Sequence, residues 1–435
     1  MSRSVGELLS EQLRLLGCAR LYRNGASAER DTRPLGDLSW FDANDDDQAL
    51  LLADADGRLS GGYGAALVAG PILHVSSQPG GRAEPRTVAS ADELIDVLAA
   101  LGAVSTPTTV ALHVDVDLDE PAAASLVARL DVPSGVAVTL NASFADAMVA
   151  VVVGPGVVRA GHIEGLREMA VLGGLGVVNT WGAKGVFRWD SPFHFGTAGL
   201  QARDFELAGV TAADIVVTCG LDPSETPLDL LGSFVIQDVE PWQLPALVAN
   251  WPRSDGPPEA RPALYAALAA VVTPMYESTT TPIEAPRAAL HLSGACPEGG
   301  VVVADAGAVG FWLARTFPTG VAGSVVVPAI AQPGFAAAAG IVARLAGRPC
   351  VAVVDGPLDS VTEGLLELAE RHGVGFGVQV WGHDGVLDDV SEHVAMTQRG
   401  FGAEVITIDD VPIGEEGLEE LVEVAGPIVA WAGEY

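Results

Sequence analysis

The chain has 435 residues, which at about 150 residues per domain predicts about three domains. Hydrophobic residues make up 49% of it and charged residues only 18%, so the sequence can bury sizeable cores and is not a disordered chain. Lys and Arg number 23 against 56 for Asp and Glu, a formal net charge of −33. So acidic a surface repels phosphate backbones and anionic lipids, which argues against nucleic-acid and membrane partners. We interpret it as the general solubility surface of a protein from a salt-adapted or high-GC organism, with an acidic face for a cationic partner as the alternative.

The cysteine usage and the N-terminus predict a cytoplasmic protein. The four cysteines form no CxxC pair and no zinc-like spacing with histidine, which predicts reduced thiols. The first residues run directly into an amphipathic stretch with Glu7, Glu11 and Arg14, so we expect no signal peptide. The longest uncharged run, 317–343, is interrupted by prolines and glycines and predicts no transmembrane helix.

The first block, residues 1–120, opens with apolar residues at a period of 3.6, which predicts a helix. An apolar run at 65–76, a helix at 89–101 and a strand at 109–114 follow. Strands that alternate with helices predict a mostly parallel sheet covered on both faces. We expect residues 115–133 to form a connector that contains a short helix.

The second block, residues 135–250, has the layout strand, glycine turn, helix, strand. This layout is typical of nucleotide-binding folds, but the turn Gly154-x-Gly156 lacks the complete GxGxxG spacing because residue 159 is Arg. We interpret it as a turn that fits the backbone, with a nucleotide site as the alternative. The predicted elements are strands at 148–153, 176–179 and 214–218 and a helix at 160–172.

A Pro-rich stretch at 251–262 is predicted to be a linker, and the third block, residues 263–435, follows it. The fold class is therefore predicted to be α/β, with three doubly wound parallel-sheet domains. The third block alternates predicted helices at 263–272, 335–346 and 360–372 with predicted strands at 300–304, 349–354 and 375–380.

Three side chains follow strands of the third block directly: Asp305, Asp355 and His383. In doubly wound sheets, ligands bind at the carboxyl ends of the strands. These residues are the clearest candidates for a site, although Asp355-Gly356 is also typical of a simple turn and His383 of an ordinary loop histidine, as is His194.

The order of the blocks and several motifs resemble the thiamine diphosphate enzymes of the acetolactate synthase and pyruvate decarboxylase type. Residues 151–187 are similar to that family's central domain, including a GKG-like loop at Lys184. The Asp305-Ala-Gly307 turn resembles the DxG turn of its diphosphate-binding domain, and residues 5–25 resemble its first helix and strand. The segment that begins at Asp47 resembles the one that carries the catalytic glutamate.

The resemblance implies three domains: a pyrimidine-binding-like domain at 1–120, a central domain at 135–250 and a diphosphate-binding-like domain at 263–435. It implies thiamine diphosphate and Mg²⁺ as cofactors and a 2-keto acid as substrate of a lyase or transferase. Asp47 would be catalytic, and Asp355 would bind the metal. Asp305, Gly307, Asp355, Gly356 and His383 would bind the cofactor.

The sequence departs from the family pattern at several of these positions. Asp47 stands where the family has Glu, a carboxylate shorter by one methylene, and it lies in an acidic run typical of a solvated loop. The family's paired asparagines fall at Trp381 and Gly382, so His383 or Asp384 could replace them only if the loop shifts. No Met precedes the Ala-rich helix near 335, and the first domain is predicted to be truncated after Arg58.

These departures leave three hypotheses open. The chain is a thiamine diphosphate-dependent decarboxylase or carboligase with an eroded site, or a catalytically silent scaffold or partner subunit, or a repurposed enzyme that does not use the cofactor. The family's site forms between subunits, so the resemblance implies a homodimer or tetramer, or a hetero-oligomer with a full-length homologue. Lys184 is the only lysine of the chain, which indicates a geometric need for a compact ammonium group.

Overall fold

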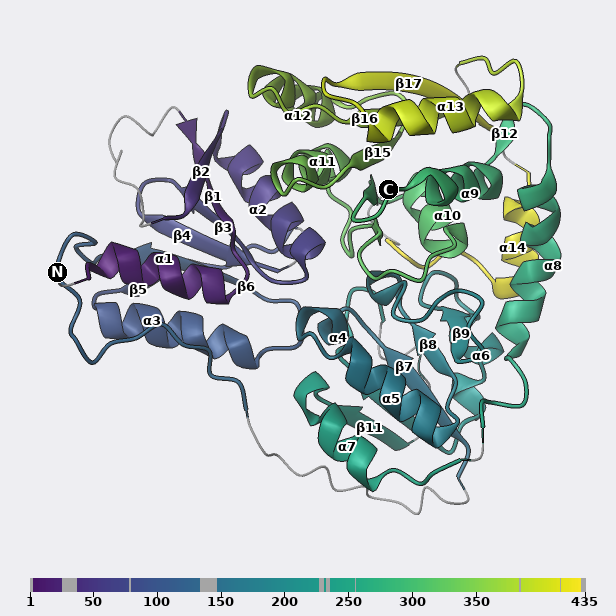
Figure 1. Ribbon diagram of the computed structural model, residues 1–435, viewed down its shortest axis with the longest axis horizontal. Helices are drawn as coiled ribbons and strands as arrows, with labels where there is room; N and C mark the ends of the chain where they lie inside the picture. The colour runs from purple at the N-terminus through teal and green to yellow at the C-terminus, as the bar shows by residue number, and fades with distance from the viewer. Residues whose placement is uncertain are drawn as a thin grey trace. The chain divides into compact units, whose positions relative to one another are not determined.

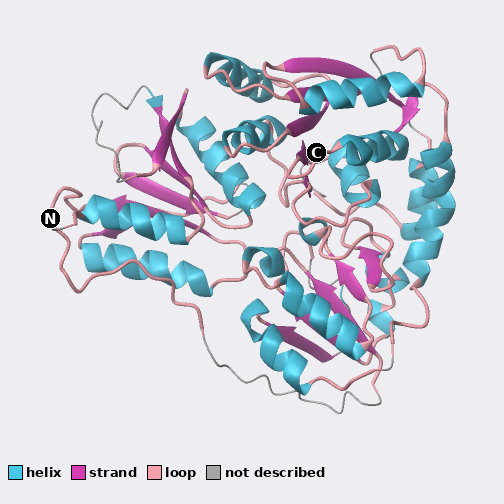
Figure 2. Cartoon of the chain, in the orientation of Figure 1, coloured by secondary structure: helices cyan, strands magenta, loops and turns pink. Residues whose placement is uncertain are grey.

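The computed structural model describes residues 3–25, 37–77, 80–133, 147–226, 231, 235–254, 256–382, 385–414 and 416–431. The chain divides into two compact units, Met1–Ser134 and Gly135–Tyr435. The first unit contains one β-sheet and the second contains two, each with helices packed against it (Figures 1 and 2). This architecture confirms the predicted α/β class with several parallel sheets.

The sheet of the first unit is mixed rather than wholly parallel. Its strands are β1 (Arg20–Asn24), β2 (Ser39–Ala43), β3 (Gly64–Val68), β4 (Ile72–Ser76), β5 (Arg86–Val88) and β6 (Thr109–Val114). They lie in the order β2-β1-β3-β4-β6-β5, and β4 is antiparallel to both of its neighbours. The apolar run 65–76 is thus a hairpin, with positive φ at Ala69 and Gly70. A loop this short cannot make the crossover that a parallel pair requires, so β4 turns back.

The helices of the first unit are α1 (Val5–Leu15), α2 (Asp46–Ser60) and α3 (Ala91–Ala100). A capping box of Ser4 and Glu7 starts α1, as its sequence favours. The prediction of a short helix within 115–133 is wrong, because this connector forms turns and extended chain. Its carbonyl groups instead accept hydrogen bonds from the first N–H groups of α1, at Glu120 from Val5 (2.9 Å) and at Leu118 from Gly6 (2.8 Å).

The first sheet of the second unit is fully parallel, in the order β11-β10-β7-β8-β9. Its strands are β7 (Val149–Val153), β8 (Val177–Asn179), β9 (His194–Thr197), β10 (Ile215–Cys219) and β11 (Val235–Val239). The helices of this part are α4 (Gly156–Arg159), α5 (Ile163–Gly173), α6 (Asp204–Leu207) and α7 (Leu244–Asn250). Alternate residues of β7 face two cores, one with α5 and α7 and the other with α6. The helix predicted at 160–172 begins three residues later, at Ile163, because Gly161 takes a left-handed φ of +71°, and the short helix α4 before it was not predicted.

The other sheet of this unit is also fully parallel, in the order β12-β17-β16-β15-β13-β14. Its strands are β12 (Ile283–Glu284), β13 (Val301–Ala304), β14 (Val325–Val326), β15 (Cys350–Asp355), β16 (Gly377–Gly382) and β17 (Thr407–Gly414). The helices are α8 (Ala263–Glu277), α9 (Ala285–Ala295), α10 (Ala308–Thr316), α11 (Phe335–Leu345), α12 (Ser360–Arg371), α13 (Val390–Phe401) and α14 (Leu418–Ala425). α9, α10 and α13 share a core with β13 and β15, while α11 packs against the same strands and α12.

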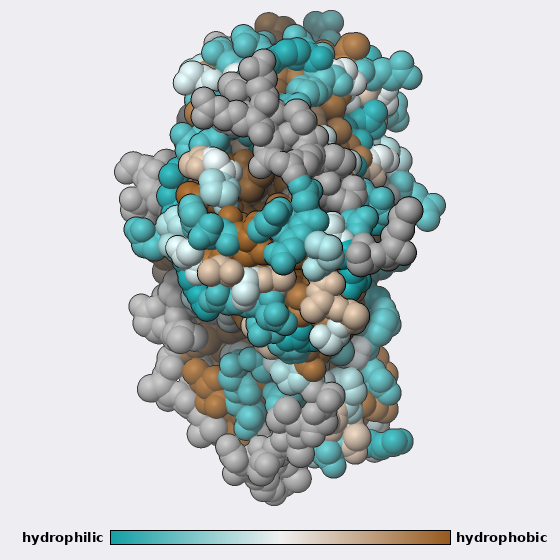
Figure 3. Space-filling model, turned by 90° about the vertical axis from the view of Figure 1, so that its left-hand side faces the viewer, coloured by the Kyte–Doolittle hydropathy of each residue, from teal (hydrophilic) through white to brown (hydrophobic). Residues whose placement is uncertain are grey.

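Hydrophilic side chains (teal) lie among smaller groups of hydrophobic ones (brown) on the face of the molecule shown in Figure 3. This mixture agrees with a sequence that has 56 acidic residues and 49% hydrophobic residues. Among the helices that the structure describes, none has the length and apolarity needed to cross a bilayer.

Candidate functional site

The third sheet brings two of the predicted site residues together at the carboxyl ends of its strands. Asp305 follows β13 directly, and Asp355 is the last residue of the adjacent strand β15. The two carboxylates are close enough for the charge of Asp355 to raise the pKa of Asp305. The prediction that both lie at one sheet edge therefore matches the structure.

Asp305 is used to cap a helix. Its Oδ1 accepts a hydrogen bond of 2.7 Å from the backbone N–H of Ala336, in the first turn of α11. The N-cap residue of α11 is Gly334, which has no side chain that could do this. Burial raises the pKa of Asp305 to about 7, the Ala336 hydrogen bond opposes this rise, and the carboxylates of Asp359 and Asp355 add to it.

Asp355 caps a second helix in the same way. Its carboxylate accepts hydrogen bonds from the backbone N–H groups of Val309 and Ala308, at the start of α10. The N-cap residue there is Gly307, whose φ of +96° lies in the region that favours glycine. Although Asp355 is solvent-exposed, the strand ends around it desolvate its carboxyl group and raise the pKa to about 6.

A third carboxylate completes this pattern. Asp359 is the N-cap of α12 and accepts hydrogen bonds from the N–H groups of Val361 (2.8 Å) and Thr362 (3.0 Å). The N-terminus of a helix is where a protein commonly binds a phosphate, because its N–H groups are free and its dipole is positive there. At this edge, the protein's own carboxylates already occupy three such positions.

The positions predicted for a second magnesium ligand offer no side-chain oxygen. Trp381 is 3% exposed, belongs to the core of the sheet and donates a hydrogen bond of 3.1 Å from Nε1 to Gln379 Oε1. Gly382 has no side chain, and the backbone N–H of Gly356 bonds to the carbonyl of Trp381 at 2.9 Å. The predicted ligand His383, like Asp384, lies outside the described residues.

Within the described part of the chain, no group of three His, Cys, Asp or Glu side chains could hold a metal ion. Magnesium requires several oxygen ligands in near-octahedral geometry. Proteins usually supply one or two of these oxygens and leave the others to phosphate and water, but the carboxylate of Asp355 is already bonded to α10. With no side-chain oxygen at Trp381 or Gly382 beside it, the residues described at this edge do not fit a magnesium–diphosphate group.

Asp47, the predicted catalytic residue, lies in the other unit, in the first turn of α2. Its side chain is 83% exposed and lies 3.3 Å from that of Arg82. Its surroundings are those of the solvated acidic run that the sequence allowed as an alternative. The buried carboxylates of α2 are Asp54 and Asp56, which sequence reasoning did not single out.

Asp56 accepts a hydrogen bond of 3.0 Å from the Tyr22 hydroxyl, and burial raises its pKa to about 6. Asp54 Oδ1 lies 3.5 Å from His74 Nε2, and its Oδ2 accepts a hydrogen bond of 3.0 Å from the N–H of Gly80. These pairs link α2 to β1 and β4 inside the first unit. Sequence analysis could have identified Asp54 and Asp56 as acidic residues placed among the apolar residues of a predicted helix.

The glycine turn after β7 is explained by backbone packing. A Cβ at Gly154 would lie only 2.4 Å from the carbonyl oxygen of Gly220, and the N–H of Gly154 donates to the carbonyl of Cys219 at 3.0 Å. Gly154 is thus required by the close approach of two strand ends, which agrees with the interpretation as a backbone turn.

A cavity in the second unit lies between β9, α8, α9 and the end of α10, away from the predicted site. Its volume is about 610 Å³, and it is lined by Lys184, His194, Arg315 and mainly apolar side chains of α8. Lys184 is 9% exposed, and its Nζ donates a hydrogen bond of 2.8 Å to the carbonyl of Ala314. Desolvation, with the nearby charge of Arg315, lowers the pKa of Lys184 to about 7.

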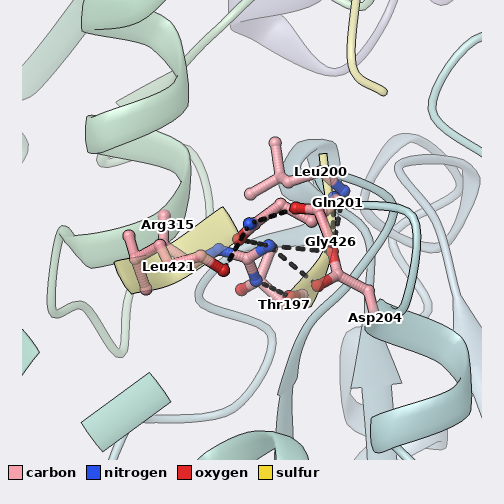
Figure 4. A network of polar contacts seen from close by, with 7 residues as sticks. All are labelled: Thr197, Leu200, Gln201, Asp204, Arg315, Leu421 and Gly426. Atoms are coloured by element: carbon pink, nitrogen blue, oxygen red, sulfur yellow. Dashed lines mark hydrogen bonds and ion pairs between the residues drawn. The ribbon is translucent and has the colours of Figure 1, made fainter. Parts of the chain in front are cut away.

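Arg315 is held by a buried polar network (Figure 4). It donates from Nη2 to both carboxylate oxygens of Asp204 at 2.8 and 2.9 Å, and from Nη1 to the carbonyl of Thr197 at 2.8 Å. The side chain of Asp204 also accepts hydrogen bonds from the N–H groups of Leu200 and Gln201, both at 2.9 Å. Sequence analysis singled out Lys184 but not Arg315 or Asp204, because their pairing joins residues 111 positions apart.

Comparison with known proteins gives similarity of two kinds, to a family model and to solved structures. Residues 145–238 match the family model of the thiamine pyrophosphate enzyme central domain. The fold is similar to the X-ray structure of a "putative thiamin diphosphate-dependent enzyme" from Mycobacterium smegmatis, with a TM-score of 0.65 and 18% sequence identity. That match covers 95% of this chain and 100% of the other, and at this identity it shows a shared fold. A search of curated proteins gives no match.

Proposed function

We propose that the chain is a catalytically silent relative of the thiamine pyrophosphate enzymes, because residues 145–238 match the family model of their central domain and the fold is similar to that of a "putative thiamin diphosphate-dependent enzyme". In this role it acts as a scaffold or as the partner subunit of an active homologue. One observation carries the proposal: the carboxylates of Asp305 and Asp355 are bonded to the N-termini of α11 and α10. A group that already caps a helix loses that hydrogen bond if it turns to a metal ion.

The second candidate is a thiamine diphosphate-dependent decarboxylase or carboligase of 2-keto acids, in which Asp47 relays the proton and Asp355 binds Mg²⁺. The observation that favours it is the position of Asp355, an exposed carboxylate at the carboxyl end of a central parallel strand. This candidate needs a further oxygen ligand from outside the described residues, such as the carboxylate of Asp384.

Ligand-induced stabilisation distinguishes the two candidates, because a ligand that binds only the native state must raise its stability. We expect millimolar thiamine diphosphate with Mg²⁺ to leave the melting temperature of the chain unchanged. At a ligand concentration about 100 times the dissociation constant, binding would add about 2.7 kcal/mol, which a thermal melt detects readily. A clear rise in melting temperature would overturn the proposal of a silent member.

The variant Gly382→Asn provides a matched gain-of-ligand control. A Cβ at Gly382 would meet only the Cα of Gly356, at 3.9 Å, so the side chain fits without a backbone clash. It places an amide oxygen at a position where the family carries one, in the strand next to Asp355. If this variant responds to Mg²⁺ and the cofactor while the natural chain does not, the missing amide explains the lost site.

The partner role implies an oligomer, either a homodimer or tetramer or a complex with a full-length homologue. Size-exclusion chromatography combined with light scattering tests it, and a chain that stays monomeric alone and with such a homologue contradicts it. We also propose a cytoplasmic location, because none of the four cysteines forms a disulfide.

A further inference from the structure

The cavity between β9, α8 and α9 has a charge opposite to that of the chain as a whole. The sequence carries 56 acidic residues against 23 basic ones, yet no Asp or Glu is among the described residues that line this cavity. Its wall contains Lys184, the only lysine of the chain, and the buried Arg315. A cavity of about 610 Å³ has the size of a small-molecule site.

Only one of these two cations is neutralised by the protein. Arg315 is paired with Asp204, whose carboxylate it contacts through both oxygens. Lys184 bonds to a backbone carbonyl, and among the described residues no carboxylate forms an ion pair or hydrogen bond with it. A buried ammonium without a counter-ion is costly, and this cost is the reason why the pKa of Lys184 is lowered to about 7. The cavity wall therefore has an excess of one positive charge when Lys184 is protonated.

The rest of the lining defines the body of the ligand. Side chains of Leu264, Leu268, Val272, Leu290 and Phe317 give the cavity an apolar wall. The side chains of Tyr265 and Ser293 add uncharged polar groups to the lining. His194 is another, since burial lowers its pKa to about 3, and its Nδ1 has no hydrogen-bond partner among the described residues. An apolar wall with one unpaired cation and one free imidazole nitrogen suits an amphipathic ligand.

We propose that this cavity binds a small organic acid with one carboxylate and an apolar body, with Lys184 as the counter-ion of the carboxylate. A dianion or a diphosphate would bring more negative charge than the single unpaired ammonium can balance. A neutral apolar molecule would leave that ammonium buried without a partner. The carboxylate supplies the missing charge and keeps Lys184 protonated at neutral pH, because an adjacent negative charge raises the pKa of an ammonium group. This site is separate from the strand edge at Asp355 and does not depend on the proposed loss of cofactor chemistry.

The test uses the full chain and two probes of the same length, octanoate and 1-octanol, which differ in charge. Binding is measured by isothermal titration calorimetry at fixed salt concentration. We expect saturable binding of one octanoate per chain. The variant Lys184→Met keeps the apolar stem without the charge, and we expect it to weaken octanoate binding about tenfold or more while 1-octanol binding is unchanged.

A second variant tests the location of the site. A Cβ at Gly294, which lines the cavity from α9, would meet no atom within 4 Å, so Gly294→Phe can be accommodated and should obstruct binding of both probes. Arg188→Met is the matched control, because it removes one positive charge from an exposed residue four positions after Lys184. We expect it to leave octanoate binding unchanged.

The proposal is overturned if octanoate does not bind, or if Lys184→Met binds it as tightly as the natural chain does. In the latter case, Lys184 serves only as a cap for the carboxyl end of α10. Equal losses in Arg188→Met and Lys184→Met would attribute the effect to general charge and would also overturn it. Circular dichroism of each variant verifies that the fold is retained.

Discussion

The second unit contains two polar regions whose groups are satisfied to different degrees. At the strand edge of the third sheet, three carboxylates accept hydrogen bonds from backbone N–H groups at the start of a helix: those of Asp305, Asp355 and Asp359. In the cavity beside β9, Lys184 donates a hydrogen bond to the carbonyl of Ala314, and no carboxylate of the described residues pairs with it. Charged residues at the strand edge therefore serve the packing of the fold, whereas the buried ammonium of Lys184 has a hydrogen-bond acceptor but no counter-ion among the described residues.

The same physical effect acts on both regions with opposite sign. Burial disfavours the charged form of any ionisable group, so it raises the pKa of Asp305 to about 7 and lowers that of Lys184 to about 7. Helix N-termini offset part of this cost for the carboxylates. For the lysine, the carbonyl of Ala314 is the offset that the structure describes.

We expect the greatest loss of stability when the buried ion pair of Arg315, which lines the cavity, is broken. Asp204→Ala leaves the guanidinium of Arg315 buried without its carboxylate, and we expect it to lower the free energy of unfolding by about 3–5 kcal/mol. Chemical denaturation measures this change. Glu206→Ala is the control, because it removes the exposed ion pair of the same helix with Arg203 and should change stability far less. Similar losses of stability in the two variants would show that the buried Asp204–Arg315 pair does not stabilise this part of the fold.

The next effect is a pH dependence that comes from Lys184. Between its folded pKa of about 7 and its ordinary value of 10.5, the unfolded chain binds a proton that the folded chain does not, so stability rises with pH. Relative to Lys184→Met, the natural chain should gain about 2 kcal/mol between about pH 7 and pH 9. Denaturation of both proteins at each pH isolates this difference. A difference that does not change with pH would mean that the ammonium is well solvated.

The ionisation of Asp305 should make the free energy of unfolding depend on pH to a similar extent, but with the opposite sign and at lower pH. Its pKa is raised from 3.8 to about 7 on folding, so the stability that it contributes is present at low pH and is lost as the pH rises through 7. Relative to Asp305→Asn, which keeps an oxygen to accept the Ala336 N–H, the natural chain should lose about 2 kcal/mol between about pH 5 and pH 7. Parallel stability curves for the two proteins would show that Asp305 is ionised throughout this range.

The smallest effect concerns Asp355 as a helix cap. Asp355→Ala removes the acceptor for two N–H groups of α10 and should cost about 1 kcal/mol, whereas Asp355→Asn, which keeps an acceptor oxygen, should cost less. Thermal melts with and without Mg²⁺ measure both. If Mg²⁺ stabilises the natural chain but not Asp355→Ala, the strand edge is a metal site and the contrast between the two regions no longer holds.

Local sequence patterns predicted three strands in each sheet of the second unit and four of its helices. The apolar runs at 300–304 and 349–354 became β13 and β15 within one residue, because buried parallel strands are almost wholly apolar. The connector 115–133 was predicted less well, since its backbone bonds to α1, which is distant in the sequence. The hairpin of β3 and β4 was missed because one apolar run spans both strands.

For the site, residue patterns alone were enough to place Asp305 and Asp355 at the ends of two strands of one parallel sheet and to single out Lys184 as the only lysine. Strand ends and residue counts are local properties, so they can be deduced without coordinates. The partners of these side chains could be known only from the folded chain, because the helix start that a carboxylate caps, or the carbonyl that accepts from an ammonium, comes from a distant part of the sequence. The Lys184 hydrogen bond to Ala314 spans 130 residues.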